Sequence, residues 1–240
     1  MREGRTTDTS PKPVREKNAF LLISVEIVVG LVLSILSFLL FVEITERVLA
    51  TSGNVDTAVA QFFYSLRTPT LTTIVEGITL FGNEIVLIAG TLLFIIINWK
   101  KHRREAIVFA VVLGMTLIIN VAIKEAIHRP RPIIDPLFHM HSYSFPSGHA
   151  MNSFVFYALL FRFIYHFTHK TELGFILAFC SIILIFLVGL SRVYLGVHYL
   201  SDVLAGFVGG FWIVITAILV ERTLVFYRIF RNRNGAISNT

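Results

Sequence analysis

Several long apolar runs constrain the fold of this chain more than any other feature. Residues 85–97 and 175–190 contain no charged side chain, so a helix built from either run has no polar face to turn towards water. A helix of about 20 mainly apolar residues crosses the hydrocarbon layer of a bilayer. With 55% hydrophobic and 15% charged residues, the 240-residue chain is too apolar for a soluble domain of this size. A soluble helical protein with a large core is therefore the disfavoured alternative.

These runs predict an all-α fold, a polytopic membrane bundle of six transmembrane helices. The spans are expected at residues 19–42, 76–97, 105–127, 150–167, 173–190 and 203–220. The fourth is the weakest because Asn152, Ser153 and Arg162 interrupt it. The first is too long for the apolar region of a signal peptide, so we expect it to remain as a membrane helix.

Polar segments at both ends of the chain flank one membrane domain. Residues 1–18 are basic and contain two prolines, which is typical of a flexible cytoplasmic tail. Residues 227–240 are expected to form a second basic tail. No internal repeat is evident between the two tails, so we interpret residues 19–226 as a single domain.

The distribution of Lys and Arg predicts the orientation in the membrane, because cytoplasmic loops are enriched in these residues. With an inner N-terminus, 15 of the 21 Lys and Arg residues fall inside and six fall outside. The six outer ones are Arg47, Arg67, Lys124, Arg129, Arg131 and Arg192. We therefore expect a multi-pass protein of the cell membrane with both termini in the cytoplasm. The placement of the charge also disfavours nucleic acid as a partner.

The segment between the first two spans has helical spacing of its apolar residues. Val55, Val59, Phe62 and Leu66 recur on one face, and Asn54 can cap the helix. We predict a short helix in the outer membrane interface. It either shapes lipid access or only covers the bundle.

The first polar motif, KEAIHRPRP at residues 124–132, closes the third span. Lys124 is costly in lipid, so it is expected to face the bundle interior or a water-filled cavity. The alternative is a snorkelling lysine beside a basic cluster that contacts headgroups. Arg131 precedes Pro132, and Arg129 precedes Pro130, so two Arg-Pro pairs compete for the same role.

The second motif, PSGH at residues 146–149, opens the fourth span. The Ser147 hydroxyl and the backbone N–H groups of a helix N-terminus suit an anion, and Gly148 lets the backbone approach a phosphate closely. An ordinary helix start capped by Ser147 uses the same donors, so the two interpretations are compatible.

The third motif, SRVYLGVHYLSD at residues 191–202, is the most specific. Arg192 offers a planar fork for two phosphate oxygens. His198 and Asp202 have the i, i+4 spacing that places two side chains on one helix face. An aspartate on one imidazole nitrogen leaves the other nitrogen as a nucleophile. The alternative is an interfacial histidine beside a helix-capping aspartate.

In order and spacing, the three motifs resemble the signature of the type 2 phosphatidic acid phosphatase (PAP2) superfamily. The resemblance implies a metal-independent phosphatase that forms a covalent phosphohistidine. It makes His198 the nucleophile, Asp202 the residue that orients it, and His149 the general acid and base. The phosphoryl oxygens would be held by Lys124, Arg131, Ser147, Gly148 and Arg192. The family pattern selects Arg131 over Arg129, which remains an auxiliary cation.

Elementary chemistry agrees with these roles. Phosphoryl transfer depends on positioning and on cations around the equatorial oxygens. The outward His and Asp residues show no metal-ligand spacing, and three cations repel a divalent ion, so no metal or cofactor is expected. These residues are Asp135, His139, His141, His149, His198 and Asp202.

The expected substrate is a membrane lipid with a phosphate or diphosphate headgroup, cleaved on the extracytoplasmic side. Undecaprenyl diphosphate, phosphatidylglycerol phosphate and phosphatidic acid all fit. Short loops and basic inner ends are typical of bacterial proteins and favour the first two. Residues 54–69 and 133–145 are expected to choose the headgroup. The alternatives are a phosphotransferase of the same fold and a non-catalytic module that binds or transports lipid phosphates. The oligomeric state is left open.

Overall fold

The computed structural model describes residues 13–50, 54–133, 135–138, 140–168 and 171–237, and all regular structure within them is helical. The all-α class is therefore confirmed for this part of the chain. The elements are α1 (Pro13–Ala50), α2 (Asn54–Ser65), α3 (Pro69–Thr79), the 3-10 helix η1 (Leu80–Gly82), α4 (Glu84–Asn98), α5 (Arg103–Ile127), α6 (Gly148–Thr168), α7 (Thr171–Tyr194) and α8 (Leu200–Ile237). Residues 1–12 and 238–240 of the two expected tails lie outside the described residues.

Long, apolar helices account for four of the expected spans. The segments that could cross a membrane by length and composition are Leu21–Ala50, Arg103–Ile127, Gly174–Tyr194 and Leu200–Arg228. A fifth arises if α3 with η1 and α4 count as one span, bent by 46° at a short break. Within the described residues the structure therefore supports four to five candidate spans, and the expected sixth is not confirmed.

The bend in the second span has a local cause. The chain leaves the α-helical path through η1, and Asn83 then takes an extended conformation. The Asn83 side chain accepts a hydrogen bond of 2.9 Å from the Ile85 N–H and so caps the start of α4. Residues 76–97 were expected as one continuous helix, and the Gly82-Asn83 pair is the turn signal that contradicts this.

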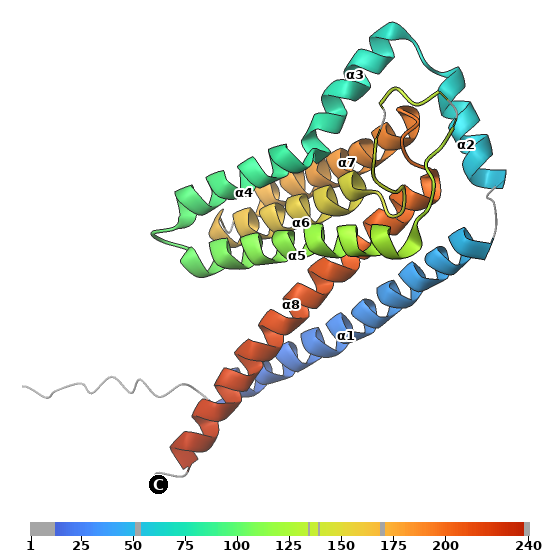
Figure 1. Ribbon diagram of the computed structural model, residues 1–240. Helices are drawn as coiled ribbons and strands as arrows, with labels where there is room; N and C mark the ends of the chain where they lie inside the picture. Colours follow the sequence, from blue (N-terminus) through green and yellow to red (C-terminus); the bar gives the residue numbers. More distant parts are fainter. Residues whose placement is uncertain (1–12, 51–53, 134, 139, 169–170, 238–240) are drawn as a thin grey trace, which may run out of the picture. The chain divides into compact units, whose positions relative to one another are not determined.

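Helix α6 contains the fourth expected span, but it is not among the helices that are long and apolar enough to cross a membrane. Its packing explains why. It packs against α4, α5 and α7, which lie beside it in Figure 1. Asn152 and Ser153 are buried and Arg162 is partly buried, so two of the three polar residues that interrupt this span point into protein. A helix enclosed by other helices does not need the hydropathy of a lipid-facing one.

Glycines on α8 let that helix approach α6 very closely. A Cβ atom on Gly206 would lie 2.8 Å from the Ser147 carbonyl oxygen, and one on Gly210 would lie 3.0 Å from the Met151 oxygen. Small residues spaced by four are typical of close helix packing in membranes. This contact holds the beginning of α8, and with it Asp202, against the beginning of α6.

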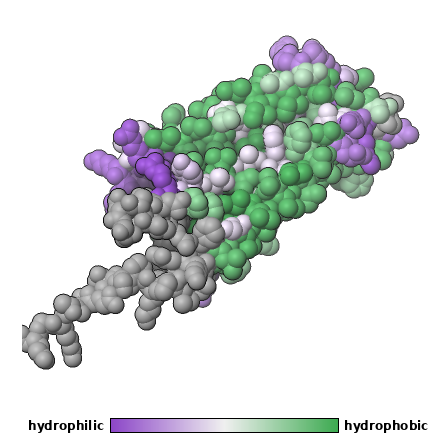
Figure 2. Space-filling model, turned by 90° about the horizontal axis from the view of Figure 1, so that it is seen from below, coloured by the Kyte–Doolittle hydropathy of each residue, from purple (hydrophilic) through white to green (hydrophobic). Residues whose placement is uncertain are grey.

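Large apolar side chains cover much of the outer surface. Ile85, Ile118 and Phe175 are 77%, 71% and 78% exposed. Figure 2 shows one face on which hydrophobic residues form a broad band between hydrophilic ends. An exposed apolar surface of this extent is expected where lipid replaces water as the solvent.

The contacts divide the chain into two units. One comprises residues 1–34 and 215–240; within its described part a hydrogen bond of 2.9 Å joins Ser34 to Thr216, and an ion pair of 3.1 Å joins Arg222 to Glu26. The other unit, Ile35–Val214, contains all three polar motifs.

Candidate active site

The three motifs meet around one cavity of about 290 Å³ in the second unit. Six of the expected site residues line it: Lys124, Arg131, Gly148, His149, Arg192 and His198. Five further residues line it: Met140 and Ser142, from a segment expected to choose the headgroup, and Asn83, Glu84 and Ile85, which were not expected. The cavity therefore gathers three cations and two histidines from segments far apart in the sequence.

Local structure explains why the motifs converge. Helix α5 ends at Ile127, and the next residue, His128, caps it: its left-handed conformation (φ 53°) lets its N–H bond to the Lys124 carbonyl. The loop after α5 then returns towards α2 and the end of α7 (Figure 1). The Ser147 N–H donates to the Asp202 carbonyl over 3.0 Å, which joins the second motif to the third.

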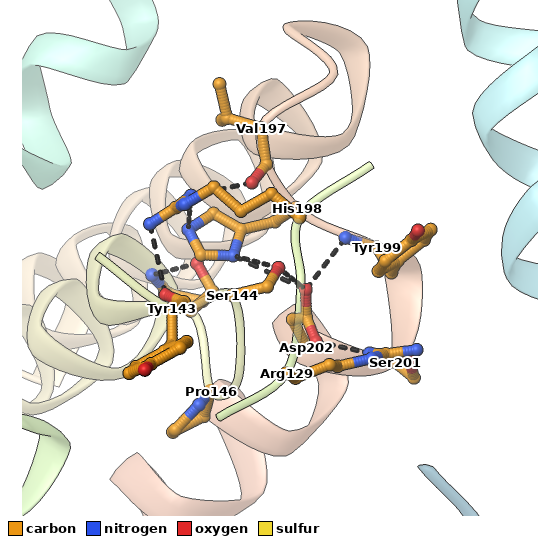
Figure 3. A network of polar contacts seen from close by, with 12 residues as sticks. Arg129, Tyr143, Ser144, Pro146, Val197, His198, Tyr199, Ser201 and Asp202 are labelled. Carbon is orange, nitrogen blue, oxygen red and sulfur yellow. Dashed lines mark hydrogen bonds and ion pairs between the residues drawn. The ribbon is translucent and has the colours of Figure 1, made fainter. Parts of the chain in front are cut away.

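His198 lies in the turn between α7 and α8 and is oriented from both sides (Figure 3). Its Nδ1 lies 3.4 Å from Asp202 Oδ2 and 3.4 Å from the Ser144 hydroxyl. Its Nε2 faces Arg131 Nη1 at 3.3 Å. Asp202 is fully buried and also accepts hydrogen bonds from the Ser144 hydroxyl and, over 2.9 Å, from the Tyr199 N–H. Nδ1 is thus occupied by the carboxylate, while Nε2 lies on the side of the cations.

The His198 imidazole is held neutral. Burial is the main cause that lowers the pKa of His198 to about 3, and the charges of Arg131 and Lys124 lower it further. The hydrogen bond and the charge of Asp202 act in the opposite direction. A neutral imidazole keeps a lone pair on one ring nitrogen, which a nucleophile requires.

Backbone carbonyls fix two of the cations. Lys124 Nζ donates to the Tyr143 carbonyl over 2.6 Å. Arg131 donates to the carbonyls of Ser142 and Val197, both over 2.7 Å. Since no carboxylate neutralises them in these contacts, both charges remain available to an anion in the cavity.

Arg192 is buried, and its Nε–H group makes no hydrogen bond within the described residues. Its side chain is only 3% exposed, and Nη1 donates to the Thr79 hydroxyl over 2.7 Å. Among the described residues, the buried Nε of Arg192 finds no acceptor. Buried guanidinium N–H groups are rarely left without a partner, so this donor is consistent with an anion binding in the cavity that it lines.

Gly148 lies in a tightly packed place at the start of α6. A Cβ atom there would lie 3.0 Å from Asn120 Oδ1 and 3.5 Å from Glu84 Oε1. Glycine therefore keeps the first turn of α6 open to the cavity. Glu84 places a carboxylate beside the cations, and no motif drew attention to it.

Three expected site residues do not line the cavity. Ser147 is buried, and its hydroxyl accepts the Ala150 N–H over 3.4 Å as a helix cap. Asp202 lies behind His198. Arg129, expected as an auxiliary cation, contacts Asp202 and also Asp56 of α2, the latter over 2.8 Å.

Asp56 and Ser144 are polar partners that the motif analysis missed. Asp56 lies in the segment predicted as an interfacial helix. Helix α2 confirms that the segment is helical, and its place at the membrane interface stays a prediction. Its carboxylate is buried next to Arg129, although the residue stands in the sequence as an ordinary acidic residue in a first helical turn. No local sequence pattern marks it as a partner of Arg129, which lies 73 residues further along the chain.

Within the described residues no group of three or more His, Cys, Asp or Glu side chains could hold a metal ion. His139, which entered the sequence argument about metals, lies outside those residues.

Known proteins are similar to this chain in sequence and in fold. A family model for the PAP2 superfamily matches residues 105–226. Phosphatidylglycerophosphatase B of Bacillus subtilis (strain 168) is 33% identical over 180 residues, covering 71% of this chain and 86% of the relative. An undecaprenyl-diphosphatase of Sulfolobus acidocaldarius is 29% identical over 161 residues, covering 64% and 72%. Both relatives are named as phosphatases, which confirms the expected class of enzyme.

Solved structures give the same result. The transmembrane PAP2 type phosphatidylglycerolphosphate phosphatase from Bacillus subtilis superimposes with a TM-score of 0.74 at 28% identity, covering 79% of this chain and 96% of that one. LpxE of Aquifex aeolicus gives a TM-score of 0.56 at 22% identity, covering 70% and 98%, and supports the fold alone. The motifs, the fold and the relatives agree, and the chain belongs to the PAP2 superfamily.

Proposed function

We propose that the protein is a membrane lipid phosphatase that works through a phosphohistidine on His198 and needs no metal ion. One observation carries the proposal: Nδ1 of His198 contacts a buried carboxylate, while Nε2 lies on the side of the cavity that three cations line. Pure anion binding does not require an oriented, neutral imidazole. Nucleophilic attack on phosphorus does.

The proposed reaction has two displacements. Nε2 of His198 attacks phosphorus, the bond from phosphorus to the lipid oxygen breaks, and His149 gives its proton to that oxygen. Water then attacks the phosphohistidine, His149 takes a proton from the water, and the P–N bond breaks. Phosphate leaves, and both histidines return to their starting protonation states.

Cations and donors around the cavity would stabilise the transferring phosphoryl group. Lys124, Arg131 and Arg192 supply positive charge, and the N-terminus of α6 at Gly148 supplies backbone N–H groups. Ser147 supports this site as the cap of α6. Lys and Arg side chains thereby serve where a metal ion serves in other phosphoryl-transfer enzymes.

A lipid substrate on the extracytoplasmic side fits the rest of the chain. The cavity lies beside Ile85, whose side chain is largely exposed on the outer surface, so a lipid tail can stay in the membrane while its headgroup enters. If α6 also crosses the membrane, enclosed by its neighbouring helices, the chain makes six crossings. The distribution of Lys and Arg then supports an inner location for both termini, with the site outside.

Phosphatidylglycerol phosphate and undecaprenyl diphosphate are the first substrates to test, because relatives carry the names of the corresponding phosphatases. Phosphatidic acid is the third candidate. Met140 and Ser142, from one of the two segments expected to choose the headgroup, line the cavity together with Asn83, Glu84 and Ile85.

Phosphate release from each lipid by purified protein in EDTA tests the proposal. Release by the wild type, none by His198→Ala, and unchanged release by the surface variant Glu43→Gln are expected. Requirement for an added metal ion would overturn the mechanism. Release that occurs only when an alcohol acceptor is supplied would favour a phosphotransferase, and tight phosphate binding without turnover would favour a binding module.

A further inference from the structure

Arg129 and Asp56 form a charged chain behind the nucleophile, on the side away from the cavity. One guanidinium nitrogen of Arg129, Nη1, donates to Asp202 Oδ1, and the other, Nη2, donates to Asp56 Oδ2 over 2.8 Å. The chain therefore runs from Asp56 through Arg129 to Asp202, and Asp202 continues it to His198 (Figure 3 labels the last three).

Each link in this chain is held by further contacts. The Ser201 N–H donates to Asp56 Oδ1 over 3.0 Å, and the Ser201 hydroxyl bonds to Asp56 and accepts from Arg129 Nη1 over 2.8 Å. The Arg129 guanidinium also lies over the Tyr199 ring, 4.4 Å from its centroid. The side chains of Asp56 and Arg129 are only 10% and 11% exposed. These contacts define the plane of the guanidinium, and the guanidinium defines the plane of the Asp202 carboxylate.

On these contacts we infer that Arg129 and Asp56 are positioning residues that hold Asp202 ionised and oriented for His198, and that Arg129 is not a phosphate ligand. The inference rests on the proposed phosphohistidine function. Oδ1 of Asp202 is engaged by Arg129, which leaves Oδ2 for His198, Ser144 and Tyr199. A carboxylate that is fully buried would be costly without such a partner.

Asp56 has an equally specific role in this arrangement. Without it, the whole charge of Arg129 would act on Asp202 and weaken the attraction of that carboxylate for His198. The phosphorylated imidazole carries a positive charge that Asp202 must stabilise, so the loss would fall on the chemical step. Asp56 lies in α2, so the charged chain begins at a helix that is not part of any of the three sequence motifs. Val55 and Phe62 of the same helix are exposed apolar residues.

The kinetic test uses Asp56→Asn, Arg129→Gln and Arg129→Lys in purified full-length protein, with Glu43→Gln as the control. Glu43 forms a carboxylate–arginine pair of the same kind with Arg47, but at the surface. We expect Asp56→Asn and Arg129→Gln to lower kcat at least about tenfold, with KM and the inhibition constant of inorganic phosphate within about threefold of the wild type. Arg129→Lys should recover part of the loss, because it keeps the charge but not the two-pronged contact.

A second background separates positioning from a general structural defect. If Asp56 and Arg129 act through Asp202, then neither substitution lowers kcat further in an Asp202→Asn protein. Additive losses in that background would overturn the inference, as would kcat within threefold of the wild type in folded Asp56→Asn. A rise of KM and of the phosphate inhibition constant in Arg129→Gln, like that expected for Arg192→Gln, would make Arg129 a phosphate ligand after all.

The test also covers a variant that does not fold and a wild type that is inactive. If Asp56→Asn does not fold, Arg129→Lys and Arg129→Gln carry the same test, because both change the residue that links Asp56 to Asp202. If the wild type releases no phosphate from any candidate lipid, the proposed function itself has failed, and this is seen before any variant is compared.

Discussion

At the scale of single residues, two different features set the orientation and the protonation state of His198. Asp202 orients the imidazole, and burial keeps it neutral. Burial lowers the pKa of His198 to about 3, and Asp202 raises it. Asp202→Asn removes the raising influence, so the pKa falls further and the imidazole stays neutral between about pH 5 and pH 9. We predict a loss in kcat of about four orders of magnitude, as for other His–Asp pairs, and no recovery at alkaline pH.

The pH profile of the Asp202→Asn variant provides the measurement. Ser144 and Tyr199 would then contact an amide instead of a carboxylate, and the tautomer of His198 would no longer be selected. Recovery of the rate at high pH would mean that the lost activity reflected a protonated nucleophile, which contradicts this account. A melting curve close to that of the wild type serves as the control.

Glu84 should make the activity depend on the negative charge of the substrate headgroup. Its carboxylate lines the cavity beside three cations and repels phosphate oxygens. Glu84→Gln is predicted to raise kcat/KM by about threefold, more for a diphosphate than for a monoester, because a diphosphate carries more negative charge. Glu125→Gln, on an exposed position of α5, is the matched control. A fall in kcat/KM would show that Glu84 contributes a favourable contact.

The residues of the site differ in how far the sequence could predict them. His198 and Asp202 do form a pair, as their i, i+4 spacing predicted. They do not share a helix face, however, because His198 lies in the turn before α8 begins. The partnership of Asp56 and Arg129 spans 73 residues and follows from how α2 meets the loop after α5. No local pattern encodes such a contact, and therefore Arg129 was grouped with the phosphate ligands.

At the scale of helices, the contact between α6 and α8 depends on glycine. A Cβ atom on Gly210 would lie 2.8 Å from the Phe154 Cβ and 3.0 Å from the Met151 carbonyl, whereas one on Gly114 of α5 would meet nothing within 4 Å. We predict that Gly210→Ala lowers the unfolding midpoint and that Gly114→Ala leaves it unchanged or raises it. Thermal unfolding in detergent measures both, and equal effects would contradict the proposed packing.

Helix existence was easier to predict than helix continuity. Apolar runs identified α1, α5, α7 and α8, because lipid demands long stretches without charge. The same rule treated α6 as a span like the others, although other helices enclose it. It also did not predict the break before α4. Enclosure of α6 and capping by Asn83 are consequences of tertiary structure that hydropathy does not measure.

At the scale of the whole molecule, the orientation in the membrane is a prediction that rests on the Lys and Arg count alone. We predict that a cysteine at Lys101, between α4 and α5, is protected in intact cells and that one at Ser65, at the end of α2, is labelled. Both are placed in a Cys180→Ser background, because Cys180 is the single, exposed cysteine of the chain. Labelling by a membrane-impermeant maleimide gives the answer, and the reverse pattern would invert the topology.

The small volume of the cavity has a consequence for how the rate should depend on substrate. About 290 Å³ accommodates a phosphorylated headgroup but no acyl or prenyl chain, so the chains stay among the neighbouring lipids. The enzyme would then meet its substrate by diffusion in two dimensions. Its rate should follow the mole fraction of substrate in the bilayer or mixed micelle, and adding inert lipid at constant total substrate should slow it by surface dilution.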